Sequence, residues 1–442
     1  MTIPLENLLD KLPMTQIQQT IHEHLQPLTE RFPDQRLKKV AEEMVLGILG
    51  SETPILTQMA RQNDRSKGEV WAASKRSYRF LDNRRLATGE LYEGLYQAGC
   101  QAVDREAPAY LVVAVDPVNF EKPYACAIEG VSTVHKATPP DLTGHARLAH
   151  GYPAITATIV NTQVPVISYA NWFSYQTADF ISQNWEIMQA LKTTSRFYPG
   201  YRLRYVGDSG LDDQKIFAQV DELHQEFVLR VSHLERIVEV YNERLDRWER
   251  EVLQDLTASV PYQVTFEVLF KHAGRTRRDK VHLGWFQVRI PGRPEQILWV
   301  LVADDPDMDR QLVLITNVAL VSVAIVQQVY NDWRLRVRIE HGYRFDQEQG
   351  LDVEDMRVRT VERMRRLFAL VLLAAQIVFV IQVHWPPKAV LWLRQLGGKL
   401  GLASDRDGPY WLLKGISAVI YTAMTWSFVF LNPFPFGEWS YG

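Results

Sequence analysis

The first part of the chain carries apolar residues at helical spacing. In residues 17–28, and again in residues 37–49, an apolar side chain recurs every three or four positions. That is the period of a helix with one buried face. No alternating pattern of the kind typical of a strand interrupts these segments. The pattern therefore predicts a helical region over residues 1–105.

From Ala109 onward the pattern changes to short apolar runs rich in β-branched residues. Residues 110–115 form one such run, which Asp116 follows, and residues 201–207 form another strand-like run, which Asp208 follows. Such runs are typical of buried central strands, so each acid is expected to close its strand at an edge of the sheet. Further strands are predicted at residues 155–160, 164–168 and 227–231, with helices at 177–193 and beginning near Asp212.

The pattern changes again between residues 238 and 305. A charged segment at 238–256 is predicted to be a helix, and strand-like segments follow it at 262–270, 281–290 and 296–302. These segments predict a β-rich insertion. After a short apolar strand at 312–316, the chain is predicted to be helical through Glu340 and on to the C-terminus.

The predicted fold class is α/β, because strands alternate with helices around a mixed sheet whose ligand sites would lie at strand ends. A β-rich insertion interrupts the core, and helical regions precede and follow it. The predicted regions are residues 1–105 (helical), 106–237 (first part of the core), 238–305 (insertion), 306–372 (second part of the core, with the helix of Glu340) and 373–442 (helical).

Composition bounds the functions that are open to the chain. With 442 residues, 46% hydrophobic and 23% charged, it has the balance of a folded protein of several domains. The formal net charge of −3 gives no global positive field, so a nucleic acid would have to be bound by local basic patches. Two cysteines exclude a disulfide framework and a four-thiolate zinc site. No secretory signal pattern begins the chain, which predicts an intracellular protein.

Two apolar runs near the C-terminus allow two interpretations. Residues 367–383 and 416–431 are each slightly shorter than the roughly 20 apolar residues that span a membrane. Both runs also contain polar residues such as Gln376 and Thr422. Buried helices are the favoured interpretation, and membrane insertion is the alternative.

Two basic segments are candidate phosphate-binding surfaces. Residues 75–85 interleave cations with Tyr78 and Phe80, and residues 271–280 are expected to form a cationic hairpin tip in the insertion. The alternatives are an amphipathic helix with solvated cations for the first segment, and a solubilising turn for the second. The candidate DNA-binding cations in the two segments are Lys75, Arg76, Arg79, Lys271, Arg275, Arg277 and Arg278.

Three acids could form a metal-dependent catalytic centre. Phosphodiester cleavage by two divalent ions needs carboxylates that come from separate elements and converge in space, and magnesium prefers such oxygen ligands. Asp116 and Asp208 follow strands, although an Asp there is also an ordinary cap. Glu340 lies on a predicted helix over residues 333–347, where Arg336 shares its face. The alternative for this last pair is a surface ion pair.

The order of these motifs resembles the DDE transposases of bacterial insertion sequences. That order is strand–Asp, strand–Asp, a β-rich insertion, and a helix carrying R-x-x-x-E-x-x-Y-R over residues 336–344. The most similar stretch is 312–366. The turn at 207–210 resembles the family's second-Asp motif, and residues 79–83 resemble a segment of its N-terminal helical domain. The resemblance covers most of residues 40–385.

The resemblance implies a ribonuclease-H-like core, a helical DNA-binding domain at residues 1–105, and an enzyme that cuts transposon ends and joins the 3′-OH to target DNA. Asp116, Asp208 and Glu340 would hold two Mg²⁺ ions, which Mn²⁺ may replace, and Arg336 and Arg344 would contact DNA. The protein would act as a homodimer on DNA, with the C-terminal helices as a dimerisation or packing element. It would work in the bacterial cytoplasm, at the nucleoid.

The sequence also departs from the family pattern. Trp333 stands at the signature tyrosine, Gln347 at the lysine seven residues beyond the glutamate, and Ser209 at the arginine after the second Asp. A glutamine in place of a lysine loses one phosphate contact. Three alternatives therefore stay open: a nuclease without strand transfer, a catalytically silent DNA-binding relative, and a membrane-associated protein. Among the other acids, Glu348 and Glu354 lie outside the Arg-x-x-x-Glu spacing, and Asp304 and Asp305 close a strand of the insertion and are expected to be turn residues.

Overall fold

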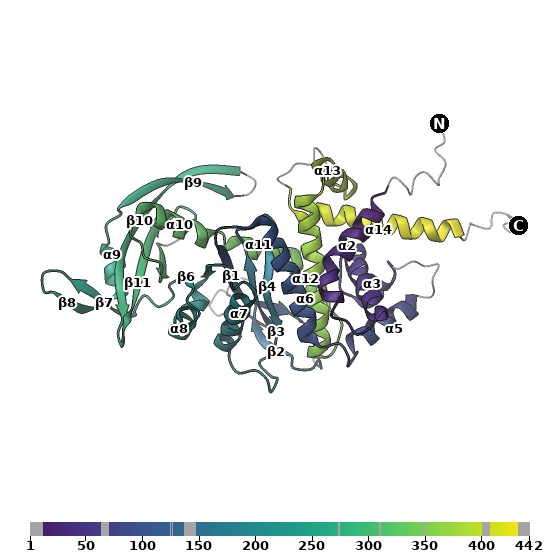
Figure 1. Ribbon diagram of the computed structural model, residues 1–442, viewed down its shortest axis with the longest axis horizontal. Helices are drawn as coiled ribbons and strands as arrows, with labels where there is room; N and C mark the ends of the chain where they lie inside the picture. The colour runs from purple at the N-terminus through teal and green to yellow at the C-terminus, as the bar shows by residue number, and fades with distance from the viewer. Residues whose placement is uncertain are drawn as a thin grey trace, which may run out of the picture.

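The computed structural model describes residues 12–62, 70–123, 125, 127–136, 147–272, 275–308, 311–347, 350–399 and 407–431. Within these ranges the chain is a mixed α/β protein built on one sheet of twelve strands, most of them paired antiparallel. Helices cover the sheet, and one end of the sheet curves away from the helical part of the molecule (Figure 1).

The N-terminal region is helical, as its pattern predicts. Where a helix begins, a local signal explains it: Asp34 caps α3 by accepting hydrogen bonds from the backbone N–H groups of Arg36 and Leu37 at 3.1 and 3.0 Å. The helices of this region are α2 (Met14–Thr29), α3 (Gln35–Ser51), α4 (Leu56–Ala60), α5 (Val70–Leu81) and α6 (Thr88–Glu106).

The central strands run in the order β4-β3-β1-β5-β6. Strands β4, β3 and β1 pair antiparallel, whereas β1, β5 and β6 are parallel. Short β2 (Ser132–His135) extends the edge beside β3. The elements of this part are β1 (Leu111–Glu121), β3 (Leu148–Ile159), β4 (Val166–Trp172), α7 (Gln183–Phe197), β5 (Leu203–Gly207), α8 (Gln214–Glu222) and β6 (Glu226–Arg230).

Alternation along β1 divides the core into two layers. Leu111, Val113 and Val115 pack into the larger hydrophobic cluster with α6, α7 and α12 (Val361–His384). Val112 and Ala114 face the smaller cluster, which includes residues of α10 (Val323–Arg334). Since side chains alternate along a strand, Asp116 belongs to the α10 face of the sheet.

The insertion is a β-rich extension of the same sheet (Figure 1). Strand β12 returns the chain to the core by pairing antiparallel with β6, and it spans the same residues that its apolar run predicts. The elements are β7 (Ile237–Asn242), β8 (Arg247–Val252), α9 (Leu253–Ser259), β9 (Val264–His272), β10 (Arg275–Ile290), β11 (Arg293–Asp304) and β12 (Leu312–Thr316).

The predicted charged helix at residues 238–256 is wrong. The segment forms the hairpin β7–β8 followed by the short helix α9. A turn decides this: the Asn242 side chain accepts hydrogen bonds from the backbone N–H groups of Arg244 and Leu245, and Asp246 adopts a left-handed φ of 49°. The predicted helix at 177–193 also begins later, at Gln183, where the Ser182 hydroxyl accepts from the backbone N–H of Trp185.

The predicted continuous helix over residues 333–347 is also corrected. Helix α10 ends at Arg334, and α11 (Val337–Gln347) begins after a break at Leu335 and Arg336. In this break the N–H of Leu335 bonds to the carbonyl of Asp332, and that of Arg336 to the carbonyl of Trp333. The N–H of Leu335 is shared with the carbonyl of Asn331, so the α-helical bonding gives way here to the tighter bonding of a 3₁₀ turn. The break places Arg336 immediately before the helix that carries Glu340.

Of the two apolar C-terminal runs, residues 367–383 form most of α12, a core helix of the protein. Among the described helices, α12 alone is long and apolar enough to cross a membrane, and 72% of that apolar window is buried inside the protein. A largely buried helix of this kind is typical of a soluble core. Helices α13 (Pro387–Leu396) and α14 (Pro409–Leu431) follow it, and Leu412, Ile416 and Ile420 of α14 are buried.

Replacement of Phe368 by alanine tests the assignment of α12 to the core. The Phe368 ring is buried against Phe120 and Trp172, with ring centroids 5.5 and 5.4 Å away. We expect Phe368→Ala to lower the free energy of unfolding by about 3–5 kcal/mol in detergent-free buffer, measured by chemical denaturation. Trp392→Ala, which removes a ring that is 41% exposed, is the control. Equal effects of the two substitutions would contradict the assignment.

Candidate active site beside β1 and the end of β5

Asp116 and Asp208 lie just beyond the last paired residues of two adjacent parallel strands. The β1–β5 pairing ends at Val115 and Gly207; Asp116 comes next within β1, and Asp208 directly follows β5. The apolar run predicts that Asp116 ends its strand, and this prediction is wrong. Strand β1 continues to Glu121 because β3 still pairs with it, with Asp116 opposite Thr156. The end of β5, and not the end of β1, leaves Asp116 beside the edge of the parallel pairing.

Glu340 reaches the same region from α11. Arg336 Nη1 lies 2.5 Å from Glu340 Oε1, and the Arg336 side chain is 14% exposed. The Arg336 guanidinium also lies 5.5 Å from the centre of the Trp333 ring. The predicted i,i+4 pair is therefore present, in a half-buried setting rather than on an open surface.

The electrostatics of Asp116 connect the three acids. Burial raises its pKa most, and the charges of Glu340 and Asp208 raise it further, whereas Arg336 lowers it; the pKa is about 7. A carboxyl with a pKa near neutrality in such a cluster is a feature of functional sites, although structural ion-pair networks also perturb pKa values. The structure thus brings Asp208 and Glu340 within electrostatic reach of Asp116.

Arg230 is a site residue that the sequence reasoning missed. It is the last residue of β6, and its Nη1 lies 3.7 Å from Asp208 Oδ1. A signal was available, because β6 runs parallel to β5 and the ends of parallel neighbours meet at one edge. Arg230 and Arg336 thus pair with two acids of this centre.

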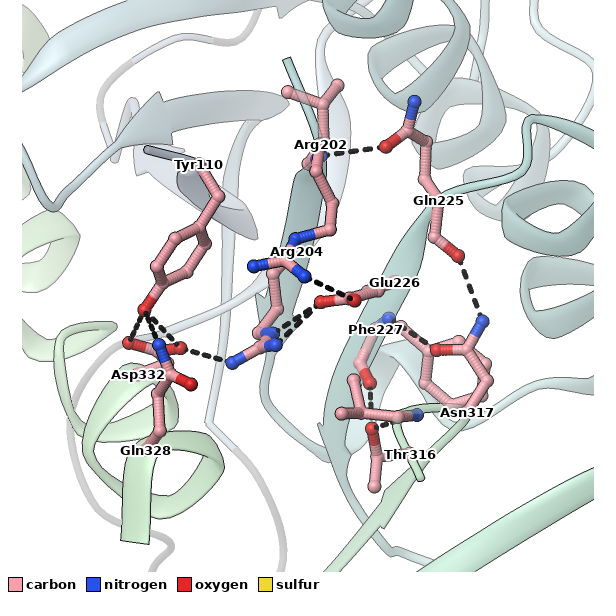
Figure 2. Close-up of polar contacts among 12 residues, drawn as sticks. Tyr110, Arg202, Arg204, Gln225, Glu226, Phe227, Thr316, Asn317, Gln328 and Asp332 are labelled. Atoms are coloured by element: carbon pink, nitrogen blue, oxygen red, sulfur yellow. Dashed lines mark hydrogen bonds and ion pairs between the residues drawn. The ribbon is translucent and has the colours of Figure 1, made fainter. Parts of the chain in front are cut away.

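A buried polar network lies on the same face of the sheet (Figure 2). Arg204, four residues before Asp208, is 2% exposed; it contacts Glu226 of β6 at 2.6 Å and Asp332 of α10 at 2.5 Å. Asp332 also accepts a hydrogen bond from the Tyr110 hydroxyl at 2.9 Å. No local pattern predicts these contacts, since Arg204 and Asp332 are far apart in sequence.

The first basic segment is divided between surface and structural roles. Lys75 and Arg79 are exposed on α5, whereas Arg76 pairs with Glu43 at 3.4 Å. Phe80 is buried at the end of this helix, and Asp82 accepts hydrogen bonds of 2.5 and 2.7 Å from a guanidinium of α12. Lys75 and Arg79 on the helix, and Arg84 and Arg85 beyond it, are thus exposed, while Asp82 between them contacts α12.

The second basic segment forms the end of the β9–β10 hairpin, as predicted. Arg277 and Arg278 are exposed, and Arg277 pairs with Asp279 at 2.5 Å. The side chains of Lys271 and Arg275 lie outside the described residues, as does that of Arg344 on α11. Only part of the predicted DNA-binding set can therefore be placed.

The donor chemistry of the centre suits a hard divalent cation. Within the described ranges, no three His, Cys, Asp or Glu side chains are gathered closely enough to hold a metal ion. However, Asp116, Asp208 and Glu340 supply carboxylate oxygens, and their mutual repulsion at Asp116 is what a cation would relieve. These three residues are the candidate ligands, and their side chains would have to draw closer together to share one ion.

Comparison with known proteins adds no assignment. No protein-family model matches the chain, and no curated protein matches it.

Removal of the Asp116 carboxyl tests its pKa. A folded-state pKa near 7, above the ordinary value of about 3.9, means that this group stabilises the fold below pH ~4 and loses that contribution as pH rises through ~7. At pH 8 we expect Asp116→Asn to be more stable than wild type by about 1–4 kcal/mol, with the difference shrinking toward pH 4. Urea denaturation between pH 4 and 8 measures it. A difference independent of pH would contradict the raised pKa, and Asp304→Asn, at an exposed site, is the control.

Proposed function

We propose that the protein is a DNA transposase that cuts phosphodiester bonds at transposon ends and joins the freed 3′-OH to target DNA. The observation that carries the proposal is that Asp208, which follows β5, and Glu340, on α11, lie close enough to Asp116 of β1 for their charges to raise its pKa. These are the acids that the resemblance to DDE transposases implies, and they come from separate elements.

The strand arrangement supports a ribonuclease-H-like core. The antiparallel group β4-β3-β1 is followed by the parallel strands β5 and β6, which is the arrangement such a core would have. Asp116 lies on β1, and Asp208 directly follows β5. The third acid lies on a helix after the β-rich insertion, in the order that the resemblance implies.

The residues of the centre have separate tasks in this reaction. Asp116, Asp208 and Glu340 would hold divalent cations, which would supply Lewis-acid activation of the attacking oxygen and charge stabilisation of the leaving oxygen. Arg336 and Arg230 flank the acids and offer positive charge to the phosphates on either side of the cut. No covalent protein–DNA intermediate is required, so no nucleophilic side chain is needed.

DNA would be held by surfaces outside the carboxylate centre. The exposed cations of α5 and of the β9–β10 hairpin extend the contact beyond the site on two separate elements. Binding through such phosphate contacts weakens steeply with salt. We propose that a homodimer holds two DNA ends, in the bacterial cytoplasm.

The replacement Glu340→Gln tests the catalytic assignment. DNA that carries the ends of the chain's own element would be incubated with protein and Mg²⁺ or Mn²⁺. We expect the wild type to nick it at the element ends and the variant to be slower by roughly 100-fold or more, because the amide keeps the shape of the side chain and loses a cation ligand. Denaturing gel electrophoresis measures the cleavage.

The matched control for Glu340→Gln is Asp304→Asn, which removes an exposed acid at the end of β11. It should cleave at the wild-type rate. DNA binding by the wild type without any metal-dependent cleavage would overturn the proposal of an active enzyme. No binding at all would return the membrane-associated alternative.

Salt-dependent binding tests the hairpin. We expect Arg278→Ala to weaken DNA binding similarly on all sequences and to reduce the slope of log K against log salt by about 1, because one phosphate contact is lost. Fluorescence anisotropy across a salt series measures both. Arg196→Ala is the control, since it removes an exposed cation from α7 on the other layer of the sheet. An equal loss in both variants would show that the hairpin has no special role.

A further inference from the structure

The indole of Trp333 attaches the α10–α11 junction to the end of β5. Trp333 is 5% exposed, and its Nε1–H donates a hydrogen bond of 3.0 Å to the carbonyl oxygen of Gly207, the residue before Asp208. The guanidinium of Arg336 lies over the same ring, and Arg336 pairs with Glu340. Three successive contacts therefore connect the residue beside one acid with another acid.

A buried ion pair fixes the same helix to the same strand. Asp332, next to Trp333 in α10, contacts Arg204 at 2.5 Å, and Arg204 lies in β5 three residues before Gly207. Figure 2 shows Asp332 between Arg204 and the Tyr110 hydroxyl, with Gln328 beside them. Two attachments between one helix end and one strand oppose both sliding and rotation of the helix.

We propose that Trp333, supported by the Arg204–Asp332 pair, is a positioning residue that sets Glu340 relative to Asp208. The catalytic part of this inference rests on the proposed function. Trp333 occupies the position of the tyrosine in the resembling family's motif, yet here the indole N–H, its only polar group, is used inside the protein. The residue therefore acts on the acid centre through α11 and not through DNA.

The attachment involves a buried backbone group. Gly207 is buried at the end of β5, and its carbonyl accepts the indole N–H. Loss of that donor removes a hydrogen bond from a buried acceptor, which costs free energy unless another donor replaces it. Without that bond, the ring that supports Arg336 is held by packing alone, and the position of Glu340 is less restricted.

The replacement Trp333→Phe tests the proposal, because phenylalanine keeps an aromatic ring for Arg336 and removes the N–H. In the full-length protein without DNA, we expect amide hydrogen exchange in α11 to become about tenfold faster, with β1 and β5 unchanged. In the cleavage assay, we expect the Mg²⁺ concentration for half-maximal rate to rise by a similar factor. A purely structural residue would not shift that metal dependence.

Tyr330→Phe is the matched control. Tyr330 lies on the same helix and its buried hydroxyl donates a hydrogen bond of 2.6 Å to Asp305 Oδ2, which follows β11 and not β5. It should lower the melting temperature yet leave exchange in α11 and the metal dependence unchanged. Unchanged exchange in Trp333→Phe, or equal acceleration in both variants, would overturn the inference. Faster exchange only in Trp333→Phe supports the attachment even if the wild type cuts no DNA. The exchange measurement therefore distinguishes failure of this inference from failure of the proposed function.

Discussion

The buried guanidinium of Arg204 is the constraint on which the arrangement of the site depends. It is 2% exposed, and a charge at such a depth costs several kcal/mol unless opposite charges and hydrogen bonds satisfy it. Its partners come from two other elements, Glu226 of β6 and Asp332 of α10. Glu226 and Asp332 can both reach Arg204 only when β5, β6 and α10 pack in one relative position. The two ion pairs therefore favour this packing over other packings that bury a similar apolar surface.

The position of the acid centre follows from this packing through the period of the strand. Arg204, Val206 and Asp208 alternate on β5 toward the same face, so fixing the first over α10 places the last near the end of that helix. Trp333 then bonds to the end of β5, and Arg336 beside it pairs with Glu340, so the position of Glu340 also depends on this packing. The centre has two arginines for three carboxylates, so its net charge is negative when all three acids are ionised. Burial and this negative charge raise the pKa of Asp116 to about 7.

The sequence predicts the features that local patterns encode. The strands that carry Asp116 and Asp208, strand β12 and the helical character around Glu340 follow from apolar runs and spacing. Prediction from the sequence fails where a single turn residue or contacts between distant residues determine the structure. The 238–256 segment is helical by composition, yet the Asn242 turn makes a hairpin. The partners of Arg204 lie far along the chain, so no window of residues reveals them. Which acid ends its strand likewise depends on pairing, as the continued β1–β3 ladder shows.

The attachment of the N-terminal helices limits how the proposed DNA binding and the proposed chemistry can be coupled. Arg366 of α12, 6% exposed, donates hydrogen bonds of 2.9 Å to the carbonyls of Leu81 and Asn83, and Arg363 pairs with Asp82 beside them. The segment that resembles a family motif is therefore the place where the N-terminal helices join the core helix. Because α12 also packs against the sheet through Phe368, DNA held by the exposed cations of α5 would be held by a surface built rigidly onto the sheet that carries the acids, and no flexible linker would be needed to bring the two together.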